Sequence, residues 1–142
     1  MYINQVSVFL ENSAGRLESA LKVLKDAGVD IKSLSLADTN DYGMLRMIVS
    51  DAAKAKDALK AAGLSAHLTD VVAIKLPHTV GSLEHVLSEV ADAGINVEYM
   101  YALSTKDENA CIVIKPEDPE ACARALEDKK FNFVTNEEVE NF

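Results

Sequence analysis

The sequence lacks the features that mark membrane and secreted proteins. No run approaches the roughly 20 apolar residues that a transmembrane helix needs, which excludes a helical membrane span. Met1 leads directly into the strand-like residues 2–10, without a basic stretch, an apolar core or a small-residue cleavage site. We therefore expect a cytoplasmic protein with no membrane partner.

Basic side chains are few and scattered. The chain has 14 lysines and arginines against 23 aspartates and glutamates, which gives a net charge of -9. Such a charge repels phosphate backbones and anionic lipid surfaces unless a local basic patch overrides it. Even adjacent lysines, such as Lys129 and Lys130, lie beside acidic neighbours. We expect no nucleic-acid partner.

Cysteine is also scarce. Cys111 and Cys122 are eleven positions apart (122 minus 111), one in an apolar strand-like run and the other in a helix-like run. This spacing is typical neither of a CxxC redox motif nor of a disulfide framework. We expect two buried, reduced thiols.

Motifs for catalysis, cofactors and metals are missing as well. Nothing resembles a nucleophile elbow, a phosphate-binding glycine loop or a dinucleotide fingerprint. The histidines, His67, His78 and His85, contain no closely spaced ligand pair. We expect no catalytic residue, no cofactor and no metal site.

What the sequence does contain is an internal repeat. Gly81 minus Gly15 and Gly94 minus Gly28 both give 66. The same offset joins six apolar pairs: Leu17 and Leu83, Ala20 and Val86, Leu21 and Leu87, Leu24 and Val90, Ala27 and Ala93, and Ile31 and Val97. The repeat predicts two domains, residues 1–69 and 70–142, each near the lower size limit for folding alone.

Hydrophobic periodicity predicts the same order of elements, βαββαβ, in both halves. The first half has elements at residues 6–10, 16–27, 29–37, 44–49, 51–62 and 64–68, with a turn at 39–43. The second has them at 71–76, 82–93, 95–103, 110–114, 118–129 and 131–135, with a turn at 105–109 and an acidic, partly frayed end at 136–142. Thr69 and Asp70 alone separate the halves. The predicted fold class is α+β, with two ferredoxin-like units in tandem, each an antiparallel sheet with both helices on one face.

Several residues are predicted to begin or end helices. Asp51 and the pair Asp118 and Pro119 are typical helix starts. Gly28 and Gly94 follow the last apolar helical residue, as helix terminators do. Three further pairs have a structural interpretation beside a functional one: capping for Ser13 and Thr79, tight turns for Gly15 and Gly81, and turn hydrogen bonds for Asp30 and Asn96.

Both halves resemble ACT domains, small-molecule regulatory modules with this βαββαβ order. Their first loop typically reads Asp-x-Pro-Gly-x-Leu, and their second strand opens with Gly-Ile-Asn-Ile or a similar sequence. The loops here are residues 12–17, Asn-Ser-Ala-Gly-Arg-Leu, and residues 78–83, His-Thr-Val-Gly-Ser-Leu. The second strands open with Gly-Val-Asp-Ile at 28–31 and Gly-Ile-Asn-Val at 94–97. The family's Asp and Pro are replaced in both loops.

The resemblance implies a regulatory protein, not an enzyme, that binds a free amino acid between the glycine loop of one unit and the second strand of its neighbour. Amides at the helix start would hold the carboxylate, and Asp30 or Asn96 would accept from the ammonium group. Selectivity would come from strand residues, among them Ser33, Leu34, Tyr99 and Met100. The candidate ligand-binding residues are Asn12, Ser13, Ala14, Gly15, Asp30, His78, Thr79, Val80, Gly81 and Asn96.

Other functions stay open at this stage. The free edges and open faces predict that the two sheets associate edge to edge or face to face within the chain, and that a remaining surface makes a homodimer. The partner enzyme that such a sensor regulates is unknown. A structural or regulatory subunit would use the same edges for protein contact and leave the loops empty. A small enzyme on this framework, such as an acylphosphatase, is disfavoured because neither loop carries a phosphate-binding basic pattern.

Overall fold

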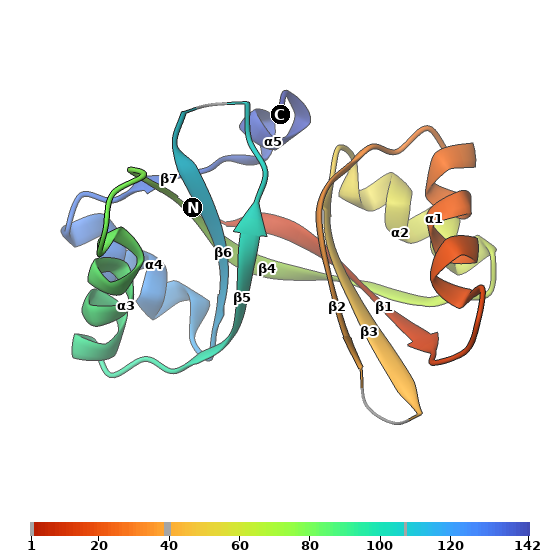
Figure 1. Cartoon of the computed structure of the whole chain (residues 1–142), viewed down its shortest axis with the longest axis horizontal. Coiled ribbons are helices and arrows are strands. Elements are labelled where there is room, and N and C mark those ends of the chain that lie inside the picture. Colours follow the sequence, from red (N-terminus) through yellow and green to blue (C-terminus); the bar gives the residue numbers. More distant parts are fainter. Residues whose placement is uncertain (1, 39–40, 107) are drawn as a thin grey trace. The chain divides into compact units, whose positions relative to one another are not determined.

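The computed structural model (Figure 1) describes residues 2–38, 41–106 and 108–142. The chain forms two compact units. The N-terminal unit comprises Asn4–Thr69 and Val139–Asn141, and the C-terminal unit comprises residues 2–3, Asp70–Glu138 and Phe142. The predicted domain bounds, 1–69 and 70–142, stay a prediction.

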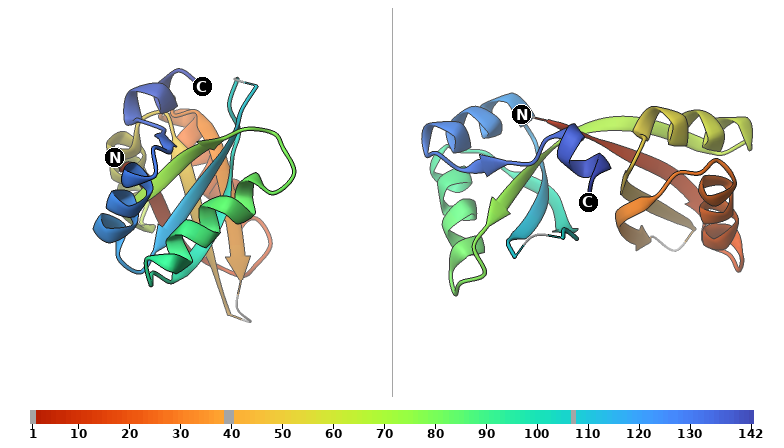
Figure 2. Two further views of the ribbon diagram at one scale, coloured as in Figure 1. Left: turned by 90° about the vertical axis from the view of Figure 1, so that its left-hand side faces the viewer. Right: turned by 90° about the horizontal axis from the view of Figure 1, so that it is seen from above.

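The N-terminal unit has a four-stranded sheet in the order β2-β3-β1-β4. Strand β3 is antiparallel to both β1 and β2. Both helices of the unit cover one face of its sheet (Figure 2). Its elements are β1 (Ile3–Glu11), α1 (Arg16–Asp26), β2 (Ile31–Asp38), β3 (Tyr42–Val49), α2 (Ala52–Ala61) and the first part of β4 (Ser65–Leu76).

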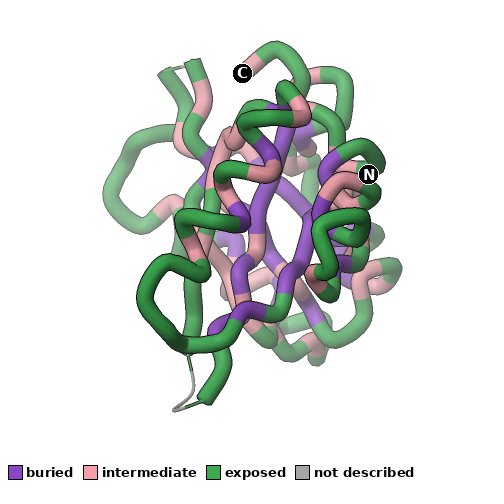
Figure 3. The backbone as a smooth tube through the Cα atoms, turned by 90° about the vertical axis from the view of Figure 1, so that its right-hand side faces the viewer, coloured by how far each residue is buried: buried purple, intermediate pink, exposed green. Residues whose placement is uncertain are grey.

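Strand alternation explains the core of this unit. Val6, Val8 and Leu10 take every second position of β1 and are buried, so they share the sheet face that packs against the helices. Leu24 of α1 and Leu59 of α2 meet them there and are fully buried. The burial pattern along the strands is visible in Figure 3. Burying each such side chain contributes about 1.5–3 kcal/mol.

The C-terminal unit repeats this arrangement, with the sheet order β5-β6-β4-β7. Its core again combines one face of the sheet with two helices: Val72, Ile74, Leu76, Val86, Val90, Ile114, Cys122, Ala123 and Leu126 are buried together. The predicted fold class is therefore confirmed. Its elements are the second part of β4, α3 (Ser82–Asp92), β5 (Val97–Leu103), β6 (Ala110–Pro116), α4 (Pro119–Asp128), β7 (Asn132–Phe133) and the first three residues of α5 (Asn136–Glu140).

The connection between the halves differs from the prediction. Thr69 and Asp70 do not separate two strands, because β4 runs without a break from Ser65 to Leu76. Its first part completes one sheet and its second part begins the other. Both residues have an extended backbone compatible with a strand, and neither is a glycine or proline that would end one.

The C-terminal end is ordered rather than frayed, which corrects a second prediction. Thr135 and Glu138 form a capping box: the Thr135 amide donates to Glu138 Oε2 (2.9 Å), and the Glu138 amide donates to Thr135 Oγ1 (3.2 Å). Helix α5 follows, with Val139 buried. Lys75 forms an ion pair with Glu138. Hydrogen bonds from Lys75 and from the Thr135 amide lower the pKa of the Glu138 carboxyl. The preceding strand β7 is only two residues long, shorter than predicted.

The two predicted turns lie partly outside the described residues. The turn at 39–43 includes residues 39 and 40, and the turn at 105–109 includes residue 107. On either side of them, β2 pairs with β3 and β5 pairs with β6, both antiparallel.

The helices end as predicted at Gly28 and Gly94. Gly28 has a φ of 72°, its amide donates to the Lys25 carbonyl (3.0 Å), and the Val29 amide donates to the Leu24 carbonyl (2.9 Å). These two bonds define a Schellman motif. The same pair of bonds follows α2, α3 and α4, where the left-handed residue is Gly63, Gly94 and Lys130 respectively.

The predicted helix starts at the two aspartates are confirmed, whereas those at Ser13 and Thr79 are wrong. Asp51 accepts from the Lys54 amide (3.0 Å), and Asp118, which precedes Pro119, accepts from the Ala121 amide (3.0 Å). Capping by Ser13 and Thr79 is wrong. The cap residues of α1 and α3 are Gly15 and Gly81, and no side chain caps either helix.

Cys111 and Cys122 are buried and unbridged, as predicted. Burial, with a smaller contribution from the nearby Asp118 carboxylate, raises the pKa of the Cys122 thiol to about 11. A buried thiol with this pKa is almost entirely protonated at neutral pH.

Candidate functional site

The loop between β1 and α1, residues 12–15, makes one tight bend before the helix. The Ser13 amide donates to the Glu11 carbonyl (2.9 Å), and the Ser13 carbonyl accepts from the Arg16 amide (3.3 Å). Gly15 then takes a φ of 85°, which a side chain would disfavour. All four residues of the loop are exposed.

The loop between β4 and α3, residues 78–81, has the same backbone. The Thr79 amide donates to the Pro77 carbonyl (2.9 Å), its carbonyl accepts from the Ser82 amide (3.2 Å), and Gly81 has a φ of 87°. In addition, Thr79 Oγ1 lies 2.6 Å from Ser82 Oγ. Val80 is fully exposed. The two loops are therefore structural equivalents.

Each loop presents backbone amides of a first helical turn. Within the described residues, the Leu17 and Glu18 amides of α1 and the Leu83 and Glu84 amides of α3 donate to no acceptor. They lie at the positive end of the helix dipole. Each loop thus has two such amide donors and no side-chain cap, so it can bind an anionic group such as a carboxylate.

A cleft of about 340 Å³ opens beside the first loop. Five elements or connections border it, because β1, the loop, α1, β2 and β3 all reach this end of the N-terminal unit. Its lining residues are Leu10, Glu11, Asn12, Ser13, Leu17, Leu36, Asp38 and Gly43. The volume lies at the lower end of the range for small-molecule pockets, about 300–1,000 Å³. We call it the loop cleft.

The loop cleft combines apolar walls with negative charge. Leu10, Leu17 and Leu36 supply the walls. Glu11 is paired with Arg16 at 3.1 Å, between Oε2 and Nη2. Among the residues that the structure describes, which exclude the neighbouring 39 and 40, the Asp38 carboxylate has no ion-pair partner. The cleft can therefore hold a cationic group beside a hydrocarbon group.

Asp30 and Asn96 lie far from the loop of their own unit. In the N-terminal unit, β2 pairs Ile31 with Val49 at one end and Asp38 with Gly43 at the other, and Gly43 also pairs with Leu10, next to the loop. Asp30 therefore lies at the opposite end of β2 from the loop. The register of β5 places Asn96 in the same way.

Both residues form hydrogen bonds through their main-chain groups, so the predicted turn hydrogen bonds of their side chains stay a prediction. The Asp30 amide donates to Ser50 Oγ (2.9 Å), and the Asp30 carbonyl accepts from the Ser50 amide (2.9 Å). The Asn96 carbonyl accepts from the Glu117 amide (2.9 Å). The Asp30 carboxylate also forms an ion pair with Lys32 at 2.7 Å.

The four strand residues expected to set selectivity divide between two faces. Leu34 pairs with Met47 and Met100 with Ile114, whose side chains are buried beneath the helices. Ser33 and Tyr99 precede them, so they point to the opposite face. The four cannot line one wall within a single unit.

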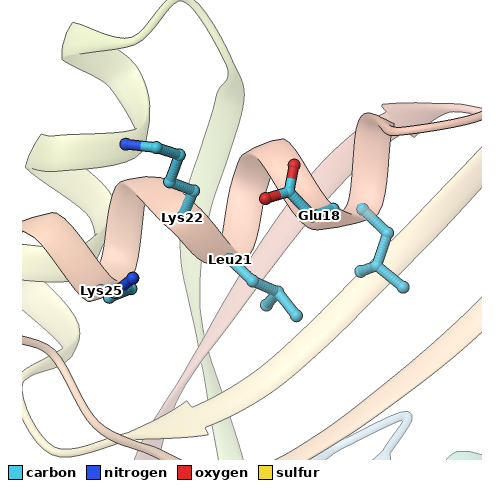
Figure 4. A pocket seen from close by; sticks show the side chains of 5 residues that line it. Glu18, Leu21, Lys22 and Lys25 are labelled. Carbon is cyan, nitrogen blue, oxygen red and sulfur yellow. The ribbon is translucent and has the colours of Figure 1, made fainter.

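A larger hollow, about 540 Å³, lies along α1 (Figure 4). Its lining comes from one helix alone: Leu17, Glu18, Leu21, Lys22 and Lys25. Lys22 is already paired with Asp26 at 2.6 Å. The loop cleft is smaller, but it joins several elements, apolar walls and the Asp38 carboxylate, so we regard it as the candidate site.

The C-terminal unit carries different residues at the equivalent positions. Strand β1 positions map by 66, since Leu10 pairs with Gly43 and Leu76 pairs with Ala110, and β3 positions map by 67 (110 minus 43). By this register Gly43, Leu36 and Asp38 correspond to Ala110, Ala102 and Ser104. Glu11 corresponds to Pro77.

Sequence reasoning missed Leu36, Asp38 and Gly43. They enter the site from the far end of β2 and the start of β3, a region that the repeated glycine motifs do not reach. The one available signal was the position of Asp38 at the end of an apolar strand, directly before a turn.

Neither a metal centre nor a membrane span is found in the described parts of the chain. No group of three or more His, Cys, Asp or Glu residues converges there. His85 instead packs near Phe131, with 5.4 Å between ring centroids. None of the described helices has the length and apolar character to cross a bilayer.

Comparison with known proteins gives matches of two kinds. The protein BT0572 of Bacteroides thetaiotaomicron shares 35% identity with this chain, covers 100% of it and 98% of its own length, and superposes with a TM-score of 0.93. The regulatory subunits of aspartate kinase from Thermus thermophilus and Thermus flavus share the fold. The first has 19% identity, covers 88% of this chain and 91% of its own length, and gives a TM-score of 0.61. The second has 22% identity, covers 88% of this chain and 90% of its own length, and gives a TM-score of 0.58. No curated protein matches.

The family comparison covers every residue. The profile of the family described as ACT domain pair matches residues 1–142. This agrees with the two βαββαβ units, the two equivalent glycine loops and the 66-residue offset between Gly15 and Gly81. The chain is a member of the ACT domain pair family.

Proposed function

We propose that this protein is a non-enzymatic sensor that binds a free amino acid at the β1–α1 glycine loop. The observation that carries the proposal is the loop cleft, about 340 Å³, which borders Asn12 and Ser13 and combines apolar walls with a carboxylate. Membership in the ACT domain pair family supports a regulatory role.

The chemistry of the loop suits the acid end of an amino acid. The Leu17 and Glu18 amides lack acceptors among the described residues, and the α1 dipole favours an anion at this position. Gly15, with no side chain, lets a ligand approach the backbone. The ammonium group then has carboxylates nearby, which makes a zwitterion a better ligand than a simple acid.

We extend the proposal to the second loop and to Asp30 and Asn96. Residues 78–81 repeat the backbone of residues 12–15, so His78, Thr79, Val80 and Gly81 form a second candidate loop. Because Asp30 and Asn96 lie at the opposite end of their own units, they can join a loop only when a neighbouring ACT unit supplies them. A homodimer would provide further neighbours of this kind.

Binding would regulate through population shift. A ligand that contacts two units stabilises the arrangement in which both sides of the site are complete. The regulated activity would belong to another protein in the cytoplasm, such as a partner enzyme, because we propose no catalytic residue in this chain.

Calorimetric titration of the protein with each common amino acid tests the proposal. We expect at least one amino acid to bind and to raise the midpoint temperature of thermal unfolding. At a hundredfold excess over Kd, binding should raise the free energy of unfolding by about 2.7 kcal/mol. Analogues that lack the carboxylate, or whose amine is acetylated, are the matched controls and should not bind. Absence of heat and of a thermal shift for every amino acid would contradict the proposal.

A second function is favoured by one surface of the N-terminal unit. Phe9 is 49% exposed and Tyr42 is 59% exposed, and both line a hollow of about 290 Å³ with Ala37 and Met44. Phe9 and Met44 pair across the sheet, on the face away from the helices. A structural or regulatory subunit could use this surface for protein contact. Thermal stabilisation by a protein partner, with none from amino acids, would support it.

A further inference from the structure

The loop cleft contains features that the family motif does not specify. Its floor is Gly43 of β3 and one of its walls is Leu36 of β2. A Cβ added at Gly43 would lie 3.3 Å from Leu36 Cδ1, tighter than ordinary van der Waals contact. Gly43 is not in the left-handed region, so its backbone does not require glycine. The missing side chain instead lets Leu36 Cδ1 lie directly against the Gly43 backbone, which fixes the position of this wall.

The C-terminal unit shows the alternative way to pack the same position. Ala110 and Ala102 stand where Gly43 and Leu36 stand in the N-terminal unit. There the methyl group of Ala110 occupies the place of the missing Cβ, and the long side chain of the wall is gone. Ser104 also replaces Asp38, and Pro77 replaces Glu11, so both acidic side chains are lost. The two units therefore differ at the positions that give the loop cleft its charge and its apolar wall.

We infer that the loop cleft of the N-terminal unit binds an amino acid with an aliphatic side chain, and that Asp38, Leu36 and Gly43 determine this specificity. This assignment rests on the proposed function. The ammonium group of the ligand donates to the Asp38 carboxylate. The hydrocarbon side chain packs against Leu10, Leu17 and Leu36 over Gly43. Amino acids with acidic side chains are excluded, because Glu11 and Asp38 would repel a second carboxylate.

The size and charge of the cleft agree with one such ligand. About 340 Å³ is enough for a branched aliphatic amino acid but small for a drug-sized molecule. Apolar walls favour a hydrocarbon side chain, because its burial removes apolar surface from water. A hydrogen bond between an ammonium group and a carboxylate fixes the orientation of the ligand.

Titration calorimetry with leucine, isoleucine, valine and methionine, compared with aspartate and glutamate, tests the ligand class. We expect the aliphatic group to bind at least tenfold more tightly than the acidic group. Asp38→Asn should weaken the best ligand about tenfold or more, because a hydrogen bond to a charged group contributes roughly 1.5–3 kcal/mol. Asp57→Asn, an exposed change of equal charge on α2, is the matched control and should leave Kd unchanged.

Gly43→Ala tests the close contact between Leu36 and Gly43, because the added Cβ would push the Leu36 side chain into the cleft. We expect it to weaken binding about tenfold while the ligand-free protein still folds, because the C-terminal unit carries alanine at this position. Circular dichroism and thermal unfolding without ligand verify the fold. The double variant Gly43→Ala with Leu36→Ala, which reproduces the C-terminal pair, should also bind weakly because the apolar wall is lost.

The outcomes separate this inference from the proposed function. If an amino acid binds but Asp38→Asn and Gly43→Ala leave its Kd unchanged, the inference is wrong and the proposed function stands. Preferential binding of aspartate or glutamate overturns the inference in the same way. If no amino acid binds the unaltered protein, both fail.

Discussion

The two units share the βαββαβ order and the backbone of their glycine loops but differ in the side chains beside these loops. Gly15 and Gly81 have φ values of 85° and 87°, and three backbone hydrogen bonds around each of them correspond. By contrast, Asp38 corresponds to Ser104 and Gly43 to Ala110. The glycines that the loop backbone requires are thus present in both units, whereas the residues that line the loop cleft differ between them. Such a pattern is expected where one backbone carries two different surfaces.

The cores allow a direct test of this comparison, because repeat-equivalent positions carry side chains of different size. Leu24 and Val90 are both essentially fully buried, and 90 minus 24 gives the repeat offset of 66. We expect Leu24→Ala to lower the free energy of unfolding by about 3 kcal/mol and Val90→Ala by about 2 kcal/mol, because leucine loses one more methylene group than valine does. Urea unfolding followed by circular dichroism measures both.

Lys22→Ala is the control for the helix itself, because Lys22 is an exposed residue of α1. We expect a change below about 0.5 kcal/mol. A larger loss for Val90→Ala than for Leu24→Ala would show that the two cores are not packed alike, in contradiction to the comparison.

A second test uses a buried residue that one core contains and the other does not. Cys122 lies in the core of the C-terminal unit, where Ala55 stands at the equivalent position (122 minus 67). Burial raises the pKa of this thiol from 9.0 to about 11. The unfolded state loses the thiol proton above pH 9 while the folded state keeps it, so stability is fully present below pH 9 and falls as the pH rises to about 11.

We expect this loss to be roughly 2 kcal/mol at its largest. Unfolding by urea at a series of pH values measures it, and Cys122→Ala, which makes the position resemble Ala55, should flatten the pH dependence. Alkylation of the native protein provides an independent readout, since Cys122 should react far more slowly than a free thiol. Rapid modification of Cys122 at pH 8 in the folded protein would be inconsistent with its burial.

Periodicity and repetition were enough to predict the order of the elements. The helix at Arg16–Asp26 was predicted within one residue at its end because its apolar stripe and Gly28 mark it independently. The same holds for Asp51 and Asp118, whose capping role follows from local chemistry. Features that depend on a few adjacent residues can be predicted from those residues.

Features that depend on distant residues could not be predicted. The short helix α5 is held by the ion pair between Glu138 and Lys75, which is 63 residues away in the sequence, in addition to its local capping box. The capping role assigned to Ser13 was wrong for a local reason, because Gly15 in the left-handed conformation starts the helix two residues later. Asp38 joins the loop cleft only through the register of β2 and β3.

The loop that ends α4 offers the smallest test, and it again compares the two units. Gly63 after α2 and Lys130 after α4 are equivalent (130 minus 67), both make the Schellman hydrogen bonds, and both have positive φ, 85° and 61°. A left-handed conformation destabilises a residue with a side chain by about 1–2 kcal/mol. A glycine in its place lowers the free energy of unfolding by about 0.4–1 kcal/mol, because it raises the conformational entropy of the unfolded chain. The difference predicts that Lys130→Gly stabilises the protein by about 0.5–1 kcal/mol.

The reverse exchange, Gly63→Lys, should destabilise by a similar amount and not by more. A Cβ at Gly63 meets nothing within 4 Å, so the cost is conformational rather than steric. Thermal unfolding of the two variants and of the double variant resolves these effects, and the double variant should lie close to the unaltered protein because the sites are independent. Stabilisation by both exchanges would mean that the conformational costs of positive φ differ between positions 63 and 130. The equivalence of the two helix ends would then apply only to their hydrogen bonds.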